Sequence, residues 1–62
     1  MKFDIWFVEF VMEAVHSGCA PDDYLFSLDT AYDDFGHAFV SGKEPVAYAH
    51  EYFSHYNPAG AH

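Results

Sequence analysis

Positively charged residues are almost missing from this sequence. It has two lysines and no arginine against ten aspartates and glutamates, so its formal net charge is −8 at pH 7 with neutral histidines. Nucleic acids and anionic membrane surfaces bind to positively charged protein faces. We therefore expect no direct binding to nucleic acid or to a membrane, and a basic protein surface is the natural partner.

Cysteine and long apolar runs are scarce as well. Cys19 is the one cysteine, so no internal disulfide forms and nothing indicates an oxidising compartment. The opening stretch "MKFDIWFVEFVMEAV" is apolar, but Asp4, Glu9 and Glu13 interrupt it, which neither a signal peptide nor a membrane span tolerates well. The sequence thus predicts a cytoplasmic protein.

Motifs of catalysis and cofactor binding are absent. There is no glycine-rich phosphate loop, no G-x-S-x-G and no convincing carboxylate pair. In "HEYFSH", His50 and His55 are five residues apart, about 140° around a helix, which is not the i, i+4 spacing of zinc proteases. Asp29, Asp33 and His37 would share a helix face, so weak metal binding remains a minor alternative. We predict no enzyme, no cofactor and no metal site.

Apolar residues are abundant, at 52% of the chain with 21% aromatic, which predicts one folded domain over 1–62. Their spacing predicts an all-α bundle of about three amphipathic helices, at about 3–17, 21–41 and 45–56, followed by a flexible tail at 57–62. The first helix is apolar around most of its circumference, so we expect protein to surround it. Alternation within 2–8 leaves open an α+β fold with a short N-terminal strand.

Five of the ten acidic residues fall on the second predicted helix: Asp22, Asp23, Asp29, Asp33 and Asp34. The first two suit the positive end of the helix dipole. Asp29 and Asp33, four residues apart, would repel by about 0.2–0.5 kcal/mol. Carboxylates at that spacing rise about 6 Å along a helix, close to the ~6.8 Å of two nucleotide steps. The row predicts either a phosphate mimic or simply a solvated acidic face.

Two aromatic residues lie outside the predicted apolar stripes. Phe26 falls on the polar side of the second helix and Tyr48 lies off the stripe of the third. Aromatic residues surrounded by charge commonly anchor protein interfaces. We predict that both contact a partner, together with the five aspartates and with Glu44 and Glu51 as a flanking negative field.

The short length, the acidic balance and the segment "PDDYLFSLDTAYDDFGH" resemble those of phage-encoded anti-CRISPR proteins and acidic DNA-mimicking antirestriction proteins. The resemblance covers the whole chain in character, and no residue-level motif is shared. It implies a monomeric, non-enzymatic inhibitor that occupies the DNA- or PAM-binding surface of a CRISPR effector, with type I complexes as the first choice. The alternative is a protein–protein interaction module, in phage assembly or antitoxin-like, that binds through exposed aromatics.

Overall fold

A computed structural model of the chain describes residues 1–55 and contains three helices there. They are α1 (Phe3–His16), α2 (Ala31–Val40) and α3 (Pro45–Ser54). No strand occurs in this part of the chain, so the predicted all-α fold is confirmed and the N-terminal strand is wrong. The predicted tail at 57–62 lies outside the described residues. Among those residues, no helix combines the length and the apolar character needed to cross a membrane.

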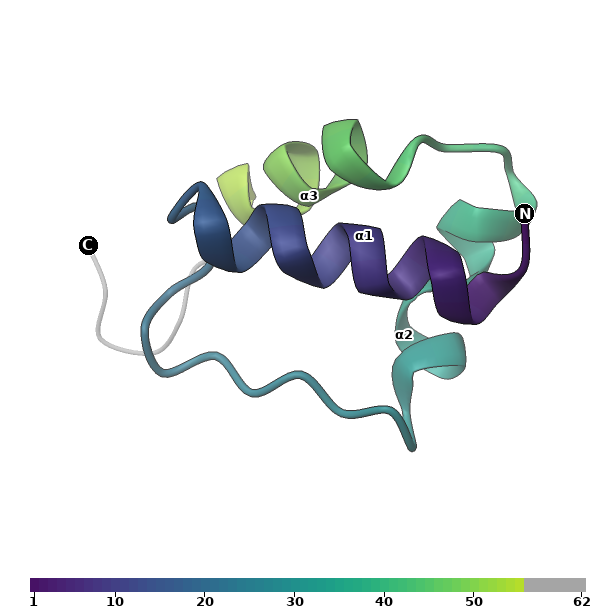
Figure 1. Cartoon of the computed structure of the whole chain (residues 1–62), viewed down its shortest axis with the longest axis horizontal. Coiled ribbons are helices and arrows are strands. Elements are labelled where there is room, and N and C mark those ends of the chain that lie inside the picture. The colour runs from purple at the N-terminus through teal and green to yellow at the C-terminus, as the bar shows by residue number, and fades with distance from the viewer. Residues whose placement is uncertain (56–62) are drawn as a thin grey trace.

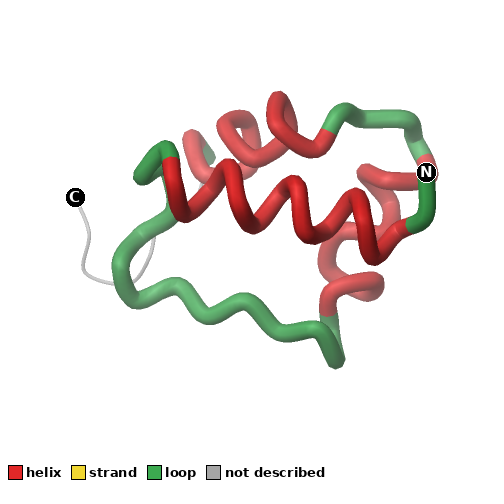
Figure 2. The backbone as a smooth tube through the Cα atoms, in the orientation of Figure 1, coloured by secondary structure: helices red, strands yellow, loops and turns green. Residues whose placement is uncertain are grey.

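The two helices α1 and α3 lie side by side and run in the same direction (Figure 1). The short helix α2 lies near the beginning of α1, where the Tyr32 ring meets the Phe3 ring edge-on at 5.0 Å between centroids. Between α1 and α2, the segment 17–30 runs back along the opposite side of α1 without helix (Figure 2). One flank of α1 is therefore covered by a helix and the other by an irregular segment.

Glycines end the first two helices. Gly18 and Gly42 follow the C-cap serines with φ of +76° and +83°, a left-handed conformation that residues with a Cβ rarely adopt. After α2, the Gly42 N–H donates to the Phe39 carbonyl and the Lys43 N–H to the Ala38 carbonyl, which is a Schellman ending. The predicted ends of the first two helices, at Gly18 and at "SGK", are thus confirmed.

Phe10 lies at the centre of the core and is 0% exposed. Aromatic rings from every part of the fold surround it, with centroids 4.7–6.2 Å away: Trp6, Phe7, Phe26, Phe35, Tyr48, Tyr52 and Phe53. Trp6 also donates its Nε1 hydrogen to the Lys43 carbonyl at 2.8 Å, which ties the α2–α3 connection to α1. Burial of aromatic rings therefore holds this small domain together.

The predicted helix at 21–41 is wrong in its first half, because α2 begins only at Ala31. Residues 24–27 are not helical, and their side chains alternate: Tyr24 and Phe26 pack against the core while Leu25 is 88% exposed. Burying an aromatic ring contributes about 1.5–3 kcal/mol, whereas extending a helix by a residue is nearly neutral. Two buried rings therefore outweigh the helical spacing. Thr30 followed by Asp33 and Asp34 marks the true helix start.

Candidate functional site: the acidic segment and the apolar groove

The acidic segment, residues 22–34, carries five aspartates that are all exposed to solvent. Asp22 and Asp23 lie in a turn after α1, and Asp29 lies in the turn that precedes α2. Only Asp33 and Asp34 are helical, as neighbours in the first turn of α2. The predicted row of carboxylates along one helix is therefore wrong, and its match to the nucleotide spacing is lost with it.

The carboxylates of the acidic segment differ in what they do for the fold. Those of Asp33 and Asp34 lie at the positive end of the α2 dipole, which stabilises negative charge. Those of Asp22, Asp23 and Asp29 have no such partner in a helix. Within residues 1–55, no ion pair joins any of the five to a cation. The segment therefore presents uncompensated negative charge to solvent.

The two glutamates predicted to flank this charge lie elsewhere. Glu44 is exposed at the N-cap position of α3. Glu51, on α3, lies 3.5 Å from the Lys43 ammonium, so a cation partly neutralises it. A second polar contact, between His50 Nε2 and Glu13 Oε2 at 2.6 Å, joins α3 to α1. Neither glutamate therefore belongs to the acidic segment, and Glu51 is paired with a cation.

The two predicted aromatic anchors differ in burial, with Tyr48 in the core and Phe26 half-buried beside α1. Tyr48 is only 7% exposed, and its ring packs 5.9 Å from that of Trp6. Burial, with smaller contributions from Tyr52 and Glu51, raises the pKa of the Tyr48 phenol above its usual value. Phe26 is half-buried, with its ring 6.2 Å from the Phe10 ring. Tyr48 is wrong as an interface anchor, because the packing of α3 on α1 covers it. The non-helical segment turns Phe26 inward, where it stays partly exposed and lines the hollow between α1 and residues 24–28.

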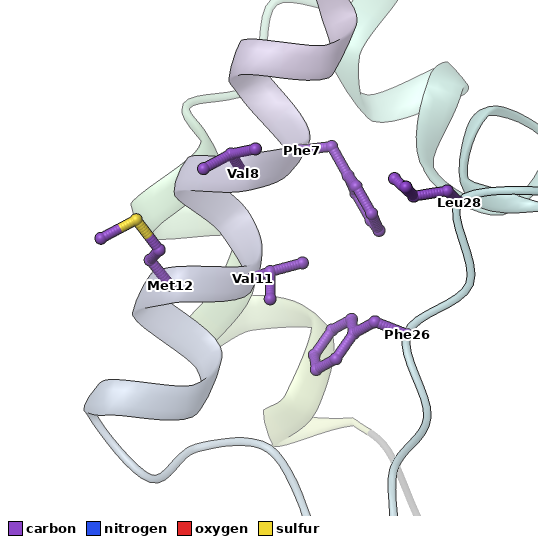
Figure 3. A pocket seen from close by; sticks show the side chains of 6 residues that line it. All are labelled: Phe7, Val8, Val11, Met12, Phe26 and Leu28. Atoms are coloured by element: carbon purple, nitrogen blue, oxygen red, sulfur yellow. The ribbon is translucent and has the colours of Figure 1, made fainter.

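An apolar groove of about 260 Å³ runs between α1 and the segment 24–28. Its lining is Phe7, Val8, Val11, Met12, Phe26 and Leu28. Figure 3 shows Phe7 and Val11 facing the segment, Phe26 and Leu28 pointing back towards α1, and Val8 and Met12 at the outer edge. The groove contains no charged side chain. It is a hydrophobic surface that lies beside the acidic segment.

The exposed face of α1 extends the apolar surface of the groove. Ile5, Val8, Met12 and Val15 are each between 51% and 56% exposed. The prediction that protein surrounds the first helix is therefore wrong for residues 1–55, because neither α2 nor α3 covers this face. The 3-4-3 spacing of these residues was visible in the sequence. This spacing does not show whether the ridge is exposed to solvent or buried under a third helix, because both cases have the same pattern.

The described residues contain no cluster of metal-binding side chains, and their one cysteine is packed between helices. No group of three or more histidine, cysteine, aspartate or glutamate side chains converges there on a metal position. Asp29 precedes α2, so it shares no helix face with Asp33 and His37. Cys19 is half-buried, with its Sγ 3.8 Å and 3.9 Å from the carbonyls of Ala14 and Ala49. The thiol packs between α1 and α3.

No protein-family model matches this chain, and no curated protein or solved structure matches it. Charge, exposure and the apolar groove are therefore the features that indicate a function.

Proposed function

We propose that the protein is a cytoplasmic, non-enzymatic inhibitor that binds a basic, nucleic-acid-binding protein surface. The target class we name is the DNA- or PAM-binding surface of a type I CRISPR effector, as for the anti-CRISPR proteins that this chain resembles in character. The observation that supports the proposal is the acidic segment, with five exposed and unpaired carboxylates in a chain of net charge −8. A monomer is sufficient for this mode of binding.

Long-range attraction gives the mechanism of inhibition. Negative charge on the inhibitor steers it towards the lysine and arginine side chains that otherwise hold phosphates. Charge-assisted hydrogen bonds between guanidinium or ammonium groups and carboxylates then compete with the nucleic acid. Regular spacing is not required, because long basic side chains adjust to carboxylates in turns. The carboxylates thus compete with DNA through their negative charge, and they need not reproduce the regular spacing of its phosphates.

The second candidate function, a protein–protein interaction module, is favoured by the apolar groove. Of its predicted exposed aromatics, Tyr48 is buried in the core and Phe26 is half-buried at the groove, so aliphatic residues would carry most of such binding. Val8, Met12 and Leu28 are exposed at the groove and have the required apolar character. The two candidates differ in their response to salt, since apolar contacts are much less sensitive to ionic strength than charge pairs.

A competition experiment tests the inhibitor. A type I effector complex is first bound to a fluorescent target duplex, and the protein is titrated in while anisotropy is followed. We expect displacement of the duplex, weakening steeply as ionic strength rises from low to physiological values. A variant with Asp22→Asn, Asp23→Asn and Asp29→Asn should lose at least about tenfold in potency, since each lost charge contact contributes roughly 0.5–1 kcal/mol.

A matched control separates the acidic segment from net charge. The variant Asp4→Asn with Glu44→Gln and Glu51→Gln removes three charges from outside the segment and away from the groove and its adjoining hollows. We expect it to keep most of its potency. Equal loss in both variants would show that total charge alone matters and that the acidic segment is no site. No displacement by the unmodified protein would reject the target class.

A further inference from the structure

We propose that the groove between α1 and the segment 24–28 binds a cationic amphipathic α-helix presented by a partner protein. The inference depends on the proposed function for the sign of the partner's charge. It adds which part of the partner is bound, namely a helix with one row of apolar side chains (its apolar seam). It also adds which side chains of this protein contact that helix.

The spacing along α1 identifies a helix as the occupant. Ile5, Val8, Met12 and Val15 are three, four and three residues apart, as are the a and d positions of a coiled coil. This ridge spans about 15 Å of helix and matches the a and d positions of two consecutive heptads. A second helix lying along such a ridge places its own a and d residues between these side chains. An extended peptide, whose side chains alternate every second residue, would not follow the 3-4-3 rhythm.

The segment 24–28 supplies the second wall of the site. Phe26 and Leu28 point towards α1 from across the groove (Figure 3). Leu28 is 79% exposed and is not among the side chains that pack against the core within residues 1–55. With Val8 and Met12 on the opposite edge, it forms an apolar channel that is open to solvent along its length. A helix seated there would cover apolar surface on both walls.

Charge around the ridge determines which helix fits. Glu9 and Glu13 line the adjoining hollow on one side of Met12, and Asp22 lines the hollow next to Val15 on the other. Asp29 directly follows Leu28 at the far end of the wall. Neither lysine of the chain lines the groove or these two hollows. Carboxylates therefore border the apolar ridge on both sides, and a helix with lysine or arginine beside its seam complements them.

The same charges argue against a second copy of this chain as the occupant. Two copies facing each other would bring together identical acidic borders and two net charges of −8. Like charges placed across an interface oppose association. A partner helix of opposite charge gains from the apolar ridge and from its borders at once.

The test uses peptides with the full protein. The probe is a three-heptad peptide with leucine at a and d and lysine and alanine elsewhere, compared with a scrambled peptide of the same composition. Binding is measured by isothermal titration calorimetry. We expect the peptide with leucine at a and d (the seam peptide) to bind at least about tenfold more tightly than the scrambled one. Only its row of leucines matches the spacing of the ridge on α1.

Variants of the protein locate the site. Val8→Thr with Met12→Gln, and separately Leu28→Ser, remove apolar surface from exposed positions, so the fold should persist; circular dichroism checks this. Each should weaken the seam peptide at least about fivefold. Val40→Ser, at an exposed valine outside the groove, is the matched control and should leave binding unchanged.

The outcomes distinguish this inference from the proposed function. The inference is overturned if the seam and scrambled peptides bind equally, or if the groove variants leave binding unchanged. Neither result affects the competition experiment with DNA, which tests the proposed function separately. Groove-dependent binding without displacement of DNA from the effector supports the helix site and rejects the named target. Concentration-dependent dimerisation in sedimentation, abolished by the Val8 and Met12 changes, would overturn the inference in favour of a second copy.

Discussion

The two flanks of α1 are built from similar residues but end in opposite states. On the α3 flank, Phe10 is fully buried among aromatic rings and Ala14 packs with no exposed surface. On the other flank, Val8 and Met12 stay about half exposed beside the irregular segment 17–30. The α3 flank therefore provides most of the buried apolar surface, whereas the groove flank keeps apolar side chains exposed to solvent. A partner that covers the second flank would gain from surface that folding has not used.

Substitutions on the two flanks should differ in effect. Changes at buried positions of the α3 flank should unfold the protein, whereas changes at the exposed groove residues Val8, Met12 and Leu28 should spare the fold and alter binding. The acidic residues follow the same division, because all five of the acidic segment lie on the connection that forms the groove wall or on the helix it leads into.

The largest effect is expected at the centre of the α3 flank. Phe10→Ala should destabilise the protein by about 3–5 kcal/mol, because it empties a site enclosed by seven rings. That equals the whole stability expected of a domain this small, roughly 3–5 kcal/mol. Loss of the cooperative thermal transition in circular dichroism would be the result. A folded Phe10→Ala variant would mean that this flank is not the source of stability.

A smaller effect is expected where the segment 17–30 is fastened to the core. Phe26→Ala should cost about 2 kcal/mol of unfolding free energy, since the half-buried ring packs on Phe7 and Phe10. Leu25→Ala, the adjacent control at an 88% exposed position, should change stability by less than about 0.5 kcal/mol. Urea denaturation measures both. Equal effects would contradict the alternation of inward and outward side chains along the segment.

The difference between the flanks also explains what the sequence could predict. Helical spacing located α1 and α3 well, because their apolar faces meet each other and Gly18 and Pro45 mark their boundaries. The same spacing failed over 21–30, where long-range contacts of Tyr24 and Phe26 override local preference. Burial of Phe26 and exposure of Leu28 depend on which segment crosses α1, which no local pattern records. The negative charge was predictable, but its arrangement was not.

The aspartates allow a finer test within the acidic segment. Asp33→Asn with Asp34→Asn should lower stability by about 0.3–1 kcal/mol per residue at low salt, because both carboxylates lie at the positive end of α2. Asp22→Asn with Asp23→Asn lies in an exposed turn and should be close to neutral. Chemical denaturation at low and high salt compares the two pairs. If both pairs were neutral, the dipole would contribute nothing here.

The smallest effect concerns Tyr48 at high pH. Burial raises the pKa of its phenol in the folded state, so the unfolded chain releases the proton first, near the usual value of about 10. The stabilisation is therefore complete below that pH and is lost as pH rises through the folded-state value. Unfolding free energies measured from pH 9 to 11 should fall less steeply for Tyr48→Phe than for the unmodified protein. Parallel curves would contradict the burial of this phenol.

Residues 21–30 form a non-helical wall along α1 and carry carboxylates beside an apolar groove. Carbon-13 chemical shifts of the Cα atoms test it most directly. We predict helical shifts over 3–16, 31–40 and 45–54, with non-helical shifts throughout 21–30. Continuous helical shifts from 21 to 40 would contradict this arrangement, because the groove would then lack its second wall and the aspartates would lie on a single helix.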